Sequence, residues 1–264
     1  MAGSRRASET PSTRAQRVWQ PTNHAPYPQI GYIDPQRGRV IARIGPHLAG
    51  IAFETMAPIC PVRTWPGQRN HESTYIFSRS DTSIRCGSGL QEQALMLLDF
   101  ENHFDTVSAQ PLWLLWPPSM PRQRHAPTFV ARTRDGGLTV VDVRASAFIG
   151  DAHRAAFAAT AAVCAELGWN HRLIETLDAT VTGNLVILAR CAHPRCAPPA
   201  ALAADLIAAA GALLSIGELT DRFGGSDPDS RAMALTGIYH LLWNGRLRVR
   251  LDRPLTMASV IGPR

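Results

Sequence analysis

The succession of helical and extended patterns in the middle of the chain constrains the fold more than any other feature. Segments with helical spacing of apolar residues alternate there with short apolar runs typical of strands. Asp135-Gly-Gly137 separates two extended runs and predicts a hairpin. The expected elements are a helix at 88–100, a strand at 111–116, extended runs at 129–134 and 138–144, a helix at 151–168, a strand at 169–174 and a helix at 178–190. This order predicts an α/β core in which helices flank a mixed sheet.

Two regions precede this core. Residues 1–25 are rich in Ser, Thr, Arg and Pro, a composition that predicts a mobile basic tail. Residues 26–85 are expected to form an N-terminal extension that packs on an α/β domain at 86–196. Alternation in Val40–Ile44 predicts one strand in this extension. Ser88 and Asp151 are the expected N-caps of the two long helices in the α/β domain.

Residues 197–264 have the pattern of a separate C-terminal domain. After the linker Ala197-Pro-Pro, we expect a helix to about Leu214. A capping box at Ser215–Glu218 begins a short second helix. Asp227-Pro228 begins a third helix, which runs to Trp243, with proline at its first position.

A hairpin is expected directly after the third helix, because Asn244-Gly245 is a strong hairpin signal. Residues 246–251 alternate strictly and place Arg246, Arg248 and Arg250 on one strand face. Three helices followed by a hairpin describe a winged helix, a variant of the helix-turn-helix. The three arginines are therefore candidate DNA contacts, although a solvated strand face would have the same pattern.

The charge balance is basic, with a formal net charge of +6 and a pI near 9.5. All 27 basic side chains are arginine, which excludes a Schiff-base lysine, a P-loop lysine and a lysine general base. Arginine suits phosphate contacts, so the bias fits nucleic-acid binding; codon bias in a GC-rich genome is the alternative. Arg122 and Arg124 are further candidate DNA contacts.

The five cysteines have no spacing typical of a disulfide framework, which favours a reducing compartment. With no secretory signal and no long apolar run, we expect a cytoplasmic protein without a membrane segment. Cys191, His193 and Cys196 have three potential zinc ligands, but an interdomain loop is the favoured interpretation because no second ligand pair lies nearby.

Four ordered runs in the α/β domain resemble one known family. They are Gln91-Glu-Gln-Ala-Leu-Met-Leu-Leu-Asp-Phe100, Gln110-Pro-Leu-Trp-Leu-Leu-Trp116, His125-Ala-Pro127 and Val140-Val-Asp-Val-Arg144. The series resembles the TnsA-like endonuclease subunit of heteromeric transposases, most closely its actinobacterial branch. The similarity extends from Pro61-Val-Arg63 through Trp169 and Cys191–Cys196 to Ile238–Trp243.

The resemblance implies a restriction-endonuclease-like core of the PD-(D/E)xK type with a C-terminal winged helix. The family's subunit nicks the 5′ ends of a mobile element with Mg²⁺. An integrase-type transposase subunit cuts the 3′ ends, and an AAA+ ATPase regulator contacts the C-terminal part. DNA and these two proteins are therefore the expected partners.

The acidic residues of the family motif are largely replaced in this chain. Gln91 stands for a helix glutamate, Thr128 for the aspartate of Pro-Asp, and Asp142-Val-Arg144 for the acid-x-Lys. If cleavage persists, Asp142 is the metal ligand, Arg144 stabilises the phosphate, and Gln91 or Glu92 completes the shell. Glu92 lies one helical position away, about 100° around the axis.

We expect Thr128 and Asp142 to lie side by side in a ligand-poor cleft, and the protein to be architectural. The alternative is a stand-alone winged-helix DNA-binding regulator. A metabolic enzyme is not supported, since the sequence has no phosphate-binding Gly-rich loop, nucleophile elbow or His-Glu-x-x-His.

Overall fold

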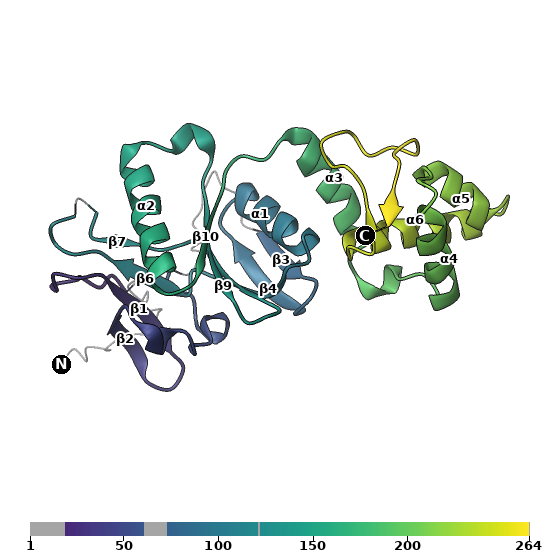
Figure 1. Ribbon diagram of the computed structural model, residues 1–264. Coiled ribbons are helices and arrows are strands. Elements are labelled where there is room, and N and C mark those ends of the chain that lie inside the picture. Colours follow the sequence, from purple (N-terminus) through teal and green to yellow (C-terminus); the bar gives the residue numbers. More distant parts are fainter. Residues whose placement is uncertain (1–18, 61–72, 121, 264) are drawn as a thin grey trace, which may run out of the picture.

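The computed structural model describes residues 19–60, 73–120 and 122–263. Figure 1 shows strands from the N-terminal part at one end of the molecule and α4–α6 at the other, with a central sheet between them. Residues 1–18 of the expected tail lie outside the described residues. Pro61–Arg63, where the family resemblance begins, lies outside them as well.

A four-stranded sheet forms the centre of the molecule, in the order β10-β9-β8-β5. Its strands are β5 (Phe104–Ala109), β8 (Phe129–Thr133), β9 (Leu138–Val143) and β10 (Asn170–Ile174). The first three are antiparallel neighbours, and β10 runs parallel to β9. The predicted hairpin at Asp135–Gly137 is confirmed. Gly136 there has a φ of 86°, a conformation that favours glycine.

The two faces of this sheet are covered by different helices. Helix α1 (Gly89–Phe100) packs on the face that carries Val141, and α2 (Asp151–Glu166) packs on the face that carries Val140. Ser88 caps α1 as predicted. The prediction for α2 was wrong by one position, because the N-cap is Gly150, which has no side chain to accept a hydrogen bond.

A second sheet, in the order β2-β1-β6-β7, packs its inner face against the α2 side of the central sheet. Its strands are β1 (Gln29–Asp34), β2 (Gly38–Arg43), β6 (Leu112–Leu115) and β7 (Arg124–His125). Because β1 pairs with β6, the N-terminal extension and the middle of the chain share this sheet. The strands expected near 40–44 and 111–116 are both present, and the second lies outside the central sheet.

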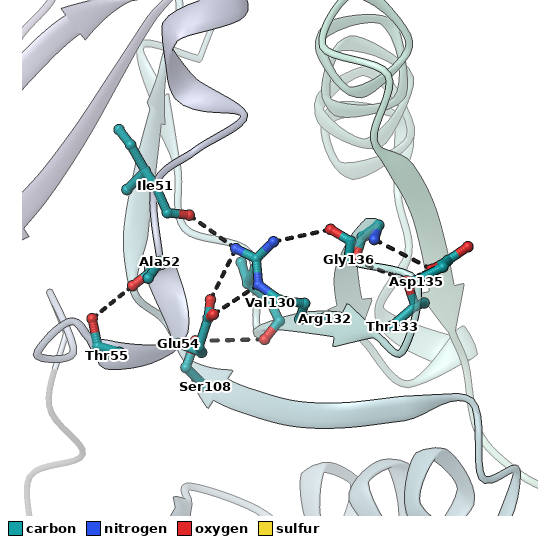
Figure 2. A network of polar contacts seen from close by, with 11 residues as sticks. Ile51, Ala52, Glu54, Thr55, Ser108, Val130, Arg132, Thr133, Asp135 and Gly136 are labelled. Atoms are coloured by element: carbon teal, nitrogen blue, oxygen red, sulfur yellow. Dashed lines mark hydrogen bonds and ion pairs between the residues drawn. The ribbon is translucent and has the colours of Figure 1, made fainter.

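An ion pair fastens the N-terminal layer to the central sheet (Figure 2). Arg132 of β8 donates from Nε to one carboxylate oxygen of Glu54 at 2.7 Å and from Nη2 to the other at 3.1 Å. The same guanidinium donates to the carbonyls of Ile51 and Gly136. Phe53, between these contacts, is fully buried in the core shared by both sheets. The remaining hairpin, β3 (Ser73–Phe77) with β4 (Thr82–Cys86), packs on the α1 side.

Four helices and a two-stranded ladder complete the chain. They are α3 (Ala179–Ala189), α4 (Ala200–Ala210), α5 (Ile216–Gly224), α6 (Pro228–Trp243), β11 (Leu247–Arg248) and β12 (Gly262–Pro263). The capping box at Ser215 and the cap at Asp227 are confirmed. Helix α4 is shorter than predicted and ends at Ala210. No helix in the described parts of the chain has the length and apolar character needed to cross a membrane.

The hairpin predicted at Asn244-Gly245 was wrong. Asn244 is instead the C-cap of α6, and Gly245 has a φ of 63°. The amide of Gly245 bonds to the Leu242 carbonyl and that of Arg246 to the Leu241 carbonyl, the pair of bonds that closes a Schellman motif. Glycine with positive φ suits both a hairpin turn and a helix C-terminus, and Gly245 ends helix α6.

Residues 249–261 connect β11 to its pairing partner β12, and this loop is held against α3. The side-chain amide nitrogen of Asn184 donates to the carbonyls of Leu251 and Arg253, and its oxygen accepts from the amide of Leu255. Asn184 is itself buried. One side chain thus satisfies three backbone groups of the 249–261 loop and fixes that loop against the middle of the chain.

Candidate functional site

Asp142 is a buried carboxylate near the end of β9. Its side chain is on the same face as that of Val140, two residues earlier, which packs against Val163 and Cys164 of α2. Only 2% of the residue is exposed. A buried carboxylate is costly unless charged or polar partners surround it, so its contacts decide what it does.

Two histidines hold this carboxylate from neighbouring strands. The Nε2 atom of His125 lies 2.8 Å from Oδ1 of Asp142, and the Nε2 atom of His171 lies 2.9 Å from Oδ2. His125 is in β7, opposite Leu114, whereas His171 is in β10, beside Val140. The Phe157 ring of α2 packs near both imidazoles, with centroids 5.9 and 6.4 Å away. Three elements that are distant in sequence therefore enclose one carboxylate.

The two hydrogen bonds determine the charge state of Asp142. Burial alone raises the pKa of this carboxyl, but the bonds from His125 and His171 outweigh burial and leave the pKa below its ordinary value. Because a carboxylate only accepts, each Nε2 carries the donated proton.

Thr128 lies beside Asp142, as the sequence predicted. Its Oγ1 accepts the amide of Val143 at 3.0 Å, and its carbonyl accepts the amide of Gln110. The threonine immediately precedes β8, whose register sets Phe129 opposite Val141. Thr128 therefore stabilises the end of the β8–β9 pair.

Gln91 and Glu92 are not brought to Asp142. Both are in the first turn of α1, which packs on the opposite face of the central sheet from Asp142. The side-chain oxygen Oε1 of Gln91 accepts the backbone amide of Gly87 at 2.7 Å. The backbone amide of Gln91 donates to the Ser88 hydroxyl. Gln91 thus contributes to the start of the helix.

Arg144 and Arg122 lie near the buried cluster with His153 of α2. Arg144 is exposed beyond the end of β9, and its Nε donates to the carbonyl of Phe148 at 3.2 Å. Desolvation and the positive charges of Arg144 and Arg122 hold the pKa of His153 below its ordinary value. Arg122 also lines a cavity of about 360 Å³ together with Trp116 and the first turns of α2. Asp151 lines the same cavity, so the surface carries both an acidic and a basic side chain.

The donor set around Asp142 does not fit Mg²⁺. This ion needs several oxygen ligands in near-octahedral geometry. Both Asp142 oxygens face imidazoles, the Thr128 hydroxyl accepts a backbone amide, and Gln91 is on the other face. Within residues 19–60, 73–120 and 122–263, no three His, Cys, Asp or Glu side chains are arranged to hold a metal.

The segment with Cys191, His193 and Cys196 forms a loop and a short turn after α3. Both cysteines are free, and the His193 Nδ1 accepts the amide of Arg195. The loop also contacts α6, because the carbonyl of Cys191 lies 2.8 Å from the Nδ1 of His240. It therefore lies at the junction of the middle and C-terminal parts.

The five arginines predicted to contact DNA lie at the C-terminal part, on β7 and, for Arg122, at the cavity beside α2. Arg246 and Arg248 are exposed at β11. Arg250 pairs with Asp252, whose carboxylate accepts from its Nε and Nη2. Arg124 belongs to β7 of the second sheet. Because side chains alternate along a strand, His125 faces Asp142 and Arg124 faces away from it.

Sequence reasoning missed the two histidines as functional partners. His125 and His171 are 17 and 29 residues from Asp142, so no local spacing connects the three. Two indications were available: His125 belongs to one of the four runs that carry the family resemblance, and His171 lies in a predicted strand.

No protein-family model matches the chain, and no curated protein matches it significantly.

Proposed function

We propose that the protein is a TnsA-like subunit of a heteromeric DNA transposase. In this role it binds transposon-end DNA and partner subunits and does not nick the 5′ ends. The observation that carries the proposal is the core itself: α1, three antiparallel strands, α2, and β10 parallel to β9. This element order is the one expected for a restriction-endonuclease-like core, and Asp142 lies on β9 where the motif's acid is expected.

The closed cluster around Asp142 supports an architectural role. A nuclease of this type needs carboxylates that can turn to a hydrated cation. Here the one carboxylate is buried between two imidazoles, and the residues at the other motif positions make backbone contacts.

The C-terminal elements support DNA or partner binding by a winged-helix domain. Helices α4, α5 and α6 are followed by β11, which pairs with β12, and Ser215 before α5 bridges to Val260. Three helices with a small sheet built in this order have winged-helix connectivity, with residues 249–261 in the place of the wing.

A nicking assay tests the absence of cleavage. We expect no 5′-end nicking when the chain is mixed with an integrase-type transposase, labelled transposon-end DNA and Mg²⁺ or Mn²⁺. Asp142→Ala is the test variant, and Asp105→Asn, which alters an exposed carboxylate on β5, is its matched control. Efficient nicking that Asp142→Ala abolishes and Asp105→Asn retains would overturn the architectural role.

The second candidate is a stand-alone winged-helix regulator. The poor fit of the central site to Mg²⁺ favours it, because a regulator needs no nuclease site. A pull-down with integrase-type and ATPase proteins encoded beside the gene separates the candidates. Capture of these proteins supports the transposase subunit, and DNA binding without capture supports the regulator.

A further inference from the structure

Arginines stacked on aromatic rings lie on the outer face of the second sheet. On β2, Val40 and Ala42 pack against the core, and alternation turns Arg39 and Arg43 outward. The guanidinium carbon of Arg43 lies 4.5 Å from the ring centroid of Tyr27. The corresponding distance from Arg39 to the Trp19 ring is 5.8 Å.

A third stack extends this surface to the other edge of the sheet. Arg124 of β7 lies 5.8 Å from the ring of Trp113 on β6. We call the surface formed by Trp19, Tyr27, Arg39, Arg43 and Arg124 the arginine–aromatic face. Each contact is within the range in which a cation is attracted to an aromatic ring.

The segment 19–27 that supplies two of these rings is fixed to the sheet. The Trp113 indole donates to the Trp19 carbonyl at 2.9 Å, and the Asn23 amide donates to the Leu115 carbonyl at 3.2 Å. Gly31 leaves room for the Trp19 ring, since a Cβ at position 31 would lie 3.2 Å from it. The rings are therefore held in position before any ligand arrives, which lowers the entropic cost of binding.

The charge of this face is not neutralised within the described structure. No acidic side chain in the described ranges pairs with Arg39 or Arg43. Asp34, the last residue of β1, accepts the backbone amides of Gln36 and Arg37 in the following turn. On Arg39 and Arg43 the stacked guanidinium keeps N–H groups at its edge, and their fork matches phosphate oxygens. Arg124 donates from Nη2 to the side-chain oxygen of Gln20 at 2.7 Å.

The sequence before Trp19 has the same sign of charge. It contains four arginines and one acidic residue, namely Arg5, Arg6, Arg14, Arg17 and Glu9. These side chains add to the basic composition of the sequence, which favours binding of a polyanion.

We propose that the arginine–aromatic face binds the phosphate backbone of duplex DNA. The inference rests on the proposed function in taking DNA as the ligand, and it adds a second contact. Arg39 and Arg43 are four residues apart on β2, a span of about 13 Å, close to the roughly 12 Å width of the major groove. Strand β2, which carries Arg39 and Arg43, lies at the end of the molecule opposite α4–α6 (Figure 1), so one duplex that contacts both ends follows the length of the protein.

Fluorescence anisotropy of the full chain with a labelled duplex of about 30 bp, titrated over a range of salt, tests the proposal. For Arg39→Ala with Arg43→Ala, the slope of log affinity against log salt is expected to fall by about 2, because each lost phosphate contact removes about 0.9. The expected loss of affinity at low salt is at least tenfold. Lysine at both positions should retain most of the slope, since it keeps the charge.

Two further variants separate this inference from the proposed function. Arg134→Ala, in the β8–β9 turn, removes an exposed arginine elsewhere and should leave binding unchanged. Arg246→Ala with Arg248→Ala tests the C-terminal contact. If that pair weakens binding and the Arg39/Arg43 pair does not, the inference is overturned and the proposed function stands.

The remaining outcomes are also decisive. If the wild-type chain binds no DNA, both the inference and the proposed function are overturned. If the Arg39/Arg43 pair abolishes capture of an integrase-type protein but leaves the salt slope intact, the face binds protein and the inference is overturned.

Discussion

Asp99 and Asp142 are equally buried, at 2% exposure each, yet their surroundings differ in kind. Asp99, in α1, accepts hydrogen bonds from the Tyr75 hydroxyl and from the amide and hydroxyl of Ser78. Asp142 is bonded to two imidazoles, which can themselves carry charge. The contacts of Asp99 fasten the 73–86 hairpin to α1, whereas those of Asp142 join β9 to β7 and β10 through two histidine side chains.

The pKa shifts of the two carboxyls have opposite signs for this reason. Burial raises the pKa of Asp99, and its hydrogen bonds with Ser78 and Tyr75 only partly offset that rise. Burial acts in the same direction on Asp142, but the bonds and charges of His125 and His171 prevail and lower its pKa. The comparison teaches that burial alone does not identify a candidate site; the identity of the partners does.

The largest expected effect comes from removing both histidines. His125→Leu with His171→Leu leaves the Asp142 carboxylate buried without its partners, and it should lower the free energy of unfolding by about 3–5 kcal/mol. Urea unfolding followed by circular dichroism measures the loss. Adding Asp142→Leu should restore part of it, since no charge then remains unpaired. Equal stability of the double variant and the wild type would contradict the importance of this cluster.

Opposite pH dependences should separate the two carboxyls. The folded pKa of Asp142 is lowered, so its contribution to stability is present above the ordinary carboxyl pKa of about 4 and is lost as pH falls through the folded pKa. The folded pKa of Asp99 is raised, so its linked stability is present at low pH and is lost as pH rises through the folded pKa.

The opposite pH dependences are checked by measuring the free energies of unfolding of Asp142→Asn and Asp99→Asn from pH 3 to pH 7. The difference between wild type and Asp142→Asn should grow with pH, and that for Asp99→Asn should shrink. The same pH trend for both variants would show that the two environments are not distinct.

The smallest effect is expected at an exposed carboxylate. Asp252 pairs with Arg250 at the surface, where water screens the charges and side-chain entropy opposes the pair. Asp252→Asn should therefore leave the urea midpoint unchanged within error. A clear shift would mean that partners matter as much at the surface as in the core, and the contrast with Asp142 would weaken.

Local signals predicted much of the fold. The hairpin at Asp135–Gly137 and the caps at Ser88, Ser215 and Asp227 depend on a few neighbouring residues, and each is present. The strands predicted at 138–144 and 169–174 are also present, each one residue shorter, at 138–143 and 170–174. Asn244-Gly245 is a local signal that fits two structures, a hairpin turn and a helix end. Glycine with positive φ ends α6 because α6 runs to Trp243 and its last carbonyls need donors.

The candidate site was predicted in part. Thr128, just before β8, lies next to the end of β9 that carries Asp142, as the hairpin requires. Gln91 is on the far face, because the side on which α1 packs cannot be read from the helix alone. His125 reached Asp142 through pairing with β6, which joined β1 in a second sheet instead of extending the central one.

By itself the sequence determined several helix caps, the 135–137 turn, strand alternation and a basic, lysine-free composition, since these depend on neighbouring residues and residue content. The tertiary structure decided which face each helix covers, which strands share a sheet and what surrounds Asp142. Those outcomes depend on contacts between residues far apart in the chain, such as the 29-residue separation of His171 from Asp142. Burial makes such contacts consequential, because a charge removed from water needs partners supplied by whichever elements pack around it.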